Sequence, residues 1–77
     1  PPDPAREAER ADERGRVHKI LNQMPERDAQ LLVLRHSGLA YREIAAALGV
    51  SPNSVGTLLA RAEKDFETRW QAMGGER

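Results

Sequence analysis

The chain has 77 residues, and its 12 Lys and Arg balance its 12 Asp and Glu. This length allows one domain at most, and the lack of cysteine excludes a disulfide framework and a thiolate metal site. Apolar runs such as Leu31–Leu34 are far too short to span a membrane. Zero net charge is unusual for an autonomous DNA-binding domain, because phosphate contacts favour a basic surface.

The first predicted helix begins at Asp3 and Pro4 and runs to Gln23. Asp3 can cap it, and Pro4 suits the first helical position, where an N–H would lack a partner. Its first half is almost entirely polar, so residues 1–15 are predicted to be a linker or a frayed helix start. The apolar stripe of this helix comprises Val17, Ile20, Leu21 and Met24.

Pro25 separates this helix from a second one, predicted over Glu26–Ser37. Leu31–Leu34 are apolar at consecutive positions, so we expect neighbouring helices to cover this helix on most sides. Gly38 is predicted to end it in the left-handed conformation.

A short third helix is predicted over Tyr41–Leu48 and closed by Gly49. A fourth begins at Pro52, capped by Ser51, and runs to about Ala72. No alternating apolar segment indicates a strand. The predicted fold is therefore all-α: a small three- or four-helix bundle that contains a helix-turn-helix.

The helix-turn-helix prediction rests on residues 41–61. Two helices that cross closely need a small residue at the contact, which Ala45 provides, and a left-handed turn residue, which Gly49 provides. Apolar residues fill the positions before, inside and after the turn. The alternative is an ordinary helical hairpin with a glycine turn. The predicted motif core comprises Tyr41, Ile44, Ala45, Leu48, Gly49, Val50, Val55 and Leu59.

In such a motif, the second helix presents its N-terminal exposed positions to the major groove of DNA. Asn53 suits adenine, whereas Ser54 and Thr57 suit base edges or phosphates. Basic residues nearby are candidates for phosphate contacts. Ordinary helix-start chemistry is an equal alternative for Asn53 and Ser54. The candidate DNA-binding residues are Arg42, Ser51, Pro52, Asn53, Ser54, Gly56, Thr57, Arg61 and Lys64.

The region Val17–Phe66 resembles the fourth conserved region of bacterial sigma factors of the extracytoplasmic-function class. The resemblance rests on Met24-Pro25-Glu26-Arg27, Leu31-Leu32-Val33-Leu34-Arg35, Ser37-Gly38-Leu39-Ala40-Tyr41-Arg42-Glu43-Ile44-Ala45, Leu48-Gly49-Val50-Ser51, Ser54-Val55 and Arg61-Ala62. The run from Gly38 to Ala45 is its most specific part.

This resemblance implies a four-helix domain over residues 16–73, followed by a disordered tail at 74–77. It implies recognition of the −35 element of promoter duplex DNA and docking on the flap of the core RNA polymerase. An anti-sigma protein is a further implied partner, and the implied location is the bacterial cytoplasm. No enzymatic activity, cofactor, metal, membrane contact or small-molecule substrate is expected.

Two departures from the family pattern bear on DNA binding. Where the family usually has Lys-Ser-Arg after the valine, this chain has Gly56-Thr57-Leu58. Ala40 replaces the usual small polar cap before the tyrosine, which predicts a poorer start for the third helix. We therefore expect weak DNA binding by the chain alone.

Two other functions remain open at this point. The domain could act mainly through protein contacts, with an anti-sigma factor or the polymerase. It could also be the output domain of a LuxR-type response regulator, whose motif is similar.

An apolar stripe in the fourth helix also has two interpretations, packing against the first helix or a surface for a partner. It comprises Leu59, Ala62, Phe66, Trp70 and Met73. His18 and His36 are expected at the surface or at helix junctions.

Overall fold

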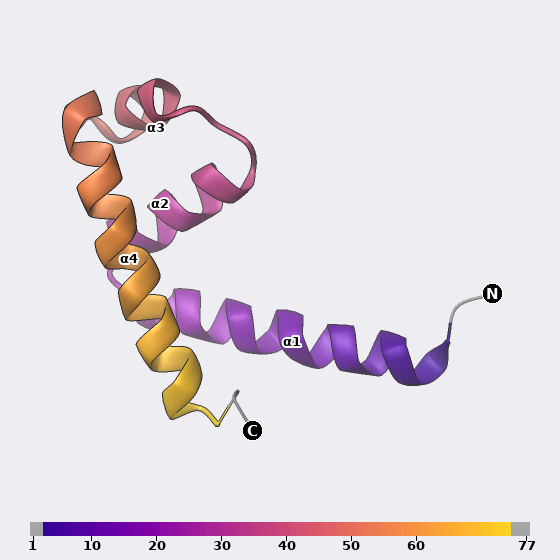
Figure 1. Ribbon diagram of the computed structural model, residues 1–77. Coiled ribbons are helices and arrows are strands. Elements are labelled where there is room, and N and C mark those ends of the chain that lie inside the picture. The colour runs from indigo at the N-terminus through magenta and orange to yellow at the C-terminus, as the bar shows by residue number, and fades with distance from the viewer. Residues whose placement is uncertain (1–2, 75–77) are drawn as a thin grey trace.

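The computed structural model describes residues 3–74, which form four helices and, within that range, no strand (Figure 1). The predicted all-α bundle is thus confirmed. Helix α2 ends one residue earlier than expected, because Ser37 is its cap and its hydroxyl donates to the Val33 carbonyl. Of the predicted tail at 74–77, residues 75–77 lie outside the described residues. The helices are α1 (Pro4–Gln23), α2 (Glu26–His36), α3 (Tyr41–Leu48) and α4 (Pro52–Ala72).

Helices α1 and α4 begin with the expected side-chain caps, whereas α3 begins with a different hydrogen bond. Asp3 accepts from the Ala5 N–H at 3.0 Å, and Ser51 accepts from the Asn53 N–H at 3.2 Å. Ala40 has no side chain that can cap α3. Instead the Glu43 carboxylate accepts from the Ala40 N–H at 2.7 Å, which is half of a capping box.

The turn between α3 and α4 is set by Gly49, whose φ of 71° is left-handed as predicted. The N–H groups of Gly49 and Val50 both donate to the Ala45 carbonyl, which satisfies the end of α3. A Cβ at Gly49 would meet nothing within 4 Å. Glycine is therefore required by the backbone conformation and not by lack of space.

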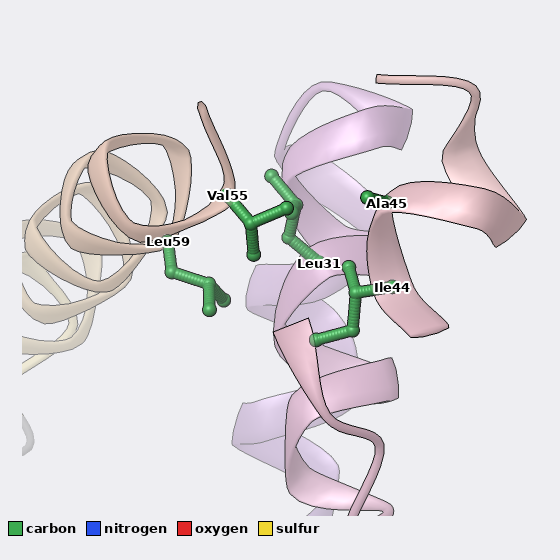
Figure 2. Packing of buried hydrophobic residues seen from close by; sticks show 5 residues of the cluster. All are labelled: Leu31, Ile44, Ala45, Val55 and Leu59. Atoms are coloured by element: carbon green, nitrogen blue, oxygen red, sulfur yellow. The ribbon is translucent and has the colours of Figure 1, made fainter. Parts of the chain in front are cut away.

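Three helices meet at one hydrophobic cluster, shown in Figure 2. Helix α2 contributes one of its members, and α3 and α4 contribute two each. The cluster holds α3 across the N-terminal end of α4 and so forms the predicted motif (Figure 1). Its members are Leu31, Ile44, Ala45, Val55 and Leu59.

A second cluster joins α1 to the middle of α4 and consists of Ile20, Met24 and Ala62. Phe66 and Trp70 pack against it, which confirms the core-packing interpretation for this part of the α4 stripe. Met73 at its end is 37% exposed. On α1, all residues before Arg16 are exposed, and this segment extends away from the other helices (Figure 1).

Helix α2 lies between these clusters, but it is less enclosed than expected. Leu31 is fully buried, and Leu32 packs against both clusters. Val33 is 48% exposed, so the expectation that this helix is covered on most sides was wrong. The reason is geometric: successive residues point about 100° apart, so four consecutive apolar residues cannot all face the same neighbours.

The ring of Tyr41, at the start of α3, lies between the Arg35 guanidinium of α2 and Gly56 of α4. A Cβ built at Gly56 would be 3.5 Å from Tyr41 Cε2, an ordinary van der Waals distance. The Arg35 guanidinium lies 5.1 Å from the ring centroid and donates to the Leu39 carbonyl at 3.1 Å. Tyr41 thus ties the α2–α3 turn to the first turns of α4.

We expect Leu31→Ala to lower the free energy of unfolding by about 3 kcal/mol, because it opens a cavity where three helices meet. Val33→Ala, two residues further along α2 on its exposed side, should lower it by less than about 1 kcal/mol. Urea unfolding followed by circular dichroism measures both changes. Equal losses would contradict the assignment of Leu31 to the core.

Two glycine substitutions should change the stability of the fold in opposite directions. Gly49→Ala should destabilise the fold by about 1–2 kcal/mol, because alanine is strained in the left-handed region. Gly56→Ala should stabilise it by about 1 kcal/mol, because glycine is unfavourable inside a helix and the new methyl finds room beside Tyr41. Thermal unfolding of the two variants measures both; a loss of stability in Gly56→Ala would mean that the Tyr41 ring cannot accommodate a methyl.

Candidate nucleic-acid interface

The candidate interface is the outer face of α4 from Pro52 to Lys64. Val55 and Leu59 are 0% and 3% exposed, so their direction fixes which side of this segment faces the core. At about 100° per residue, the opposite side carries Asn53, Thr57 and Lys64 close to its centre. All of these side chains are exposed, and so are Ser54, Ala60 and Arg61 beside them.

At the beginning of α4, one residue caps the helix and a different residue exposes a free polar side chain. Ser51 is the residue whose oxygen caps the helix, and the Ser54 N–H donates to the Ser51 carbonyl at 2.9 Å. Asn53 takes part in the cap through its backbone N–H alone. Within residues 3–74 its side-chain amide makes no hydrogen bond, so both its donor and its acceptor remain available to a ligand.

None of the three cations predicted to contact phosphates lies in the first two turns of α4. Arg42 is exposed on the first turn of α3, and Arg61 and Lys64 are exposed further along α4. Arg61 lies about 12 Å along the helix axis from Asn53. In the described part of the chain, neither of the two ion pairs involves any of these three cations.

The remaining predicted residues lie at the start of α4 or take part in the packing of the helices. Pro52 and Ser51 are exposed at the helix start, whereas Gly56 is half-buried next to the Tyr41 ring. In the predicted motif core, Ile44, Ala45, Val55 and Leu59 are buried, Leu48 and Val50 are half-buried, and Gly49 and Tyr41 are exposed.

Sequence reasoning missed the contacts among Arg35, Tyr41 and Gly56. The separations of six and fifteen residues follow no helical period, and Arg35 reaches the ring from the preceding helix. Glycine within a predicted helix was the one signal that pointed to a close approach.

Two apolar grooves flank α2, and Leu21 and Val33 line both of them. The groove between α1, α2 and α4, here the Phe66 groove, is completed by Val17, Leu32 and Phe66, with Arg35 and Glu63 among its polar residues. The groove between α1, α2 and α3, here the Ala47 groove, is completed by Met24, Leu34, Ala47 and Leu48, among others. Both grooves lie away from the outer face of α4.

Other kinds of site find no support in the described residues. His18 and His36 are exposed, and residues 3–74 contain no group of three His, Cys, Asp or Glu that could hold a metal ion. In the same range no helix combines the length and the apolar character that a membrane span requires.

In a comparison with known families, the family "Sigma-70, region 4" matches residues 14–66. The comparisons with curated proteins and with solved structures gave no match. The matched residues run from the second half of α1 through both grooves and the helix-turn-helix to Phe66, and they cover more than half of the chain.

This family is a DNA-binding domain of transcription factors and not a class of enzymes. In sigma factors generally, it recognises the −35 element of promoters and contacts both promoter DNA and the core RNA polymerase. With an exposed polar face on α4 and a family match that spans it, the chain belongs to the sigma-70 region 4 family.

Proposed function

We propose that this chain is the promoter-reading domain of a sigma factor of the extracytoplasmic-function class. In this proposal α4 enters the major groove at the −35 element with its outer face towards the bases. One observation carries it: in the same two turns, Val55 and Leu59 are anchored in the core while Asn53, Ser54 and Thr57 face outwards.

The proposed roles follow from side-chain chemistry. Asn53, Ser54 and Thr57 would reach base edges, because each carries hydrogen-bonding groups near the start of the helix. Arg42, Arg61 and Lys64 would bind phosphates and fix the position of the domain on the duplex. Ser51 and Pro52, exposed at the start of α4, would allow the backbone there to approach the DNA closely, whereas Gly56 packs beside the Tyr41 ring.

The assignment to the extracytoplasmic-function class is supported by the run from Gly38 to Ala45 and by Met24-Pro25. Members of that class dock on the flap of RNA polymerase, and many are held inactive by an anti-sigma protein. We place the polymerase contact at the Phe66 groove, because Val17, Leu32, Val33 and Phe66 form an apolar surface there without blocking the outer face of α4.

A second candidate function is that the domain acts mainly through protein contacts. It is favoured by the net charge of zero and by the first two turns of α4, Pro52–Leu59, which contain no charged residue. In that function an anti-sigma protein or the polymerase would occupy a groove beside α2, and DNA binding by the chain alone would be negligible.

We expect the chain to bind promoter duplexes with an affinity that depends moderately on salt. With about three phosphate contacts, log K should fall with a slope of about −2.7 against log salt concentration. That slope corresponds to a loss of about 40-fold between 50 and 200 mM salt. Fluorescence anisotropy with labelled duplexes tiled across candidate promoters measures it.

Matched lysine variants test whether the contacts lie where we place them. Lys64→Ala should reduce the slope by about one unit, because one phosphate contact is lost. Lys19→Ala removes the same charge from an exposed position on α1 and should leave the slope unchanged. Equal effects of the two variants, or no binding even at low salt, would favour the protein-contact function.

We expect Val33→Glu to weaken binding to core RNA polymerase by at least about tenfold, because it puts a charge into an apolar contact. Val33 is already half exposed, so the fold should survive, and circular dichroism checks this. Glu67→Val, a change on an exposed part of α4 that lines neither groove, is the control. Unchanged polymerase binding by Val33→Glu would exclude both grooves as the docking surface.

A further inference from the structure

We propose that α4 reads adenine and thymine, with Asn53 recognising an adenine and Thr57 a neighbouring thymine, while its cations contact phosphates only. This inference rests on the proposed function and adds the base identity and the residues that determine it. It follows from which side chains the fold leaves exposed in the first turns of α4.

The first step is the chemistry of the first two turns. Guanine is read most often by Arg or Lys, and cytosine by the carboxylate of Asp or Glu. Pro52–Leu59 contain none of these four residue types. Reading residues in a helix-turn-helix come from the N-terminal part of the second helix. The helix therefore lacks the usual readers of a G·C pair where reading occurs.

The second step is the availability of Asn53. An asparagine at a helix start is commonly a cap, in which its side chain is occupied. Here the oxygen of Ser51 is the cap, and it accepts from the Asn53 backbone at 3.2 Å. The exposed Asn53 amide is left with one donor group and one acceptor, the pair that adenine N7 and N6 require.

The third step is the neighbourhood of Thr57, one turn further along the same face. Gly56 beside it has no side chain, and the space next to Gly56 is taken by the Tyr41 ring. Ala60, the next exposed residue towards the C-terminus, adds only a methyl group. Arg61, one turn further along α4, is the first charged residue of this helix, so no charge precedes Thr57 on the outer face. The exposed methyl group of Thr57 suits contact with the methyl group of thymine.

The last step is the distance to the cations. Arg61 and Lys64 lie about 12 and 16 Å along the helix axis from Asn53. The major groove is about 12 Å wide, so both distances reach or exceed its full width. With Asn53 at the bases, we therefore expect these two cations to lie near phosphates and away from the base that Asn53 contacts. They supply affinity in this arrangement, and the two uncharged residues supply sequence preference.

The experiment is selection of the 77-residue chain on a randomised duplex library at low salt, followed by anisotropy with single duplexes. We expect selected sites with a fixed A·T pair. Replacing its adenine by 7-deazaadenine should weaken binding by about 5- to 100-fold, because one bond of the Asn53 pair is lost. Asn53→Ala should bind both duplexes equally, and circular dichroism checks its fold.

Thr57 is tested with a pair of variants that separate its methyl from its hydroxyl. Replacing thymine by uracil removes the base methyl and should weaken binding by about fourfold. Thr57→Val keeps a methyl and should retain this preference, whereas Thr57→Ser loses the methyl and should not discriminate between the two bases.

Two outcomes would overturn the inference. A preference for G·C pairs that disappears in Arg61→Ala would mean that a cation reads the bases, and promoter recognition by α4 would still stand. Selection that yields no sequence preference at all would refute the inference together with the proposed reading of promoters by α4.

Discussion

The burial of Val55 and Leu59 against Leu31 fixes the rotation of α4 about its own axis. Neighbouring residues on a helix point about 100° apart, so rotation by a single residue step would exchange the outer face for a flank. The turn at Gly49 sets where α4 begins, and the cluster sets which side faces outwards. The set of residues on the outer face of α4 depends on these two constraints.

Much of this arrangement could be predicted from the sequence, because the decisive signals are local. Asp3 and Ser51 identify helix starts through capping chemistry, and Gly49 identifies a left-handed turn. The spacing of Ile44, Val55 and Leu59 gives the inward faces of α3 and α4. These signals act over a few residues and do not depend on the rest of the fold.

The features that could not be predicted from the sequence depend on tertiary contacts. The exposure of Val33 was misjudged because a run of consecutive apolar residues does not say which of them faces the other helices. The Tyr41 ring meets Arg35 and Gly56 only after the α2–α3 turn has formed. The roles of the polar residues on α4 depend on a ligand, so neither sequence pattern nor fold alone determines them.

In the described part of the chain, a polar surface and an apolar surface lie on different sides of the bundle. The outer face of α4 is polar, whereas the grooves beside α2 are apolar and share Leu21 and Val33. Leu32 packs against both hydrophobic clusters and is therefore the residue of α2 that joins the two halves of the core. A protein and a duplex could thus be held at the same time without competing for the same side chains.

The position of Trp70 has a practical consequence for spectroscopy. It is the only tryptophan in the chain, and its ring lies 5.2 Å from the Arg16 guanidinium and next to Phe66. It lies about 25 Å along the helix axis from Asn53. Its fluorescence therefore reports the packing of α1 on α4, and a ligand that contacts only the start of α4 should leave the emission spectrum as it is. A spectral change on adding a duplex would reveal that the bundle itself rearranges.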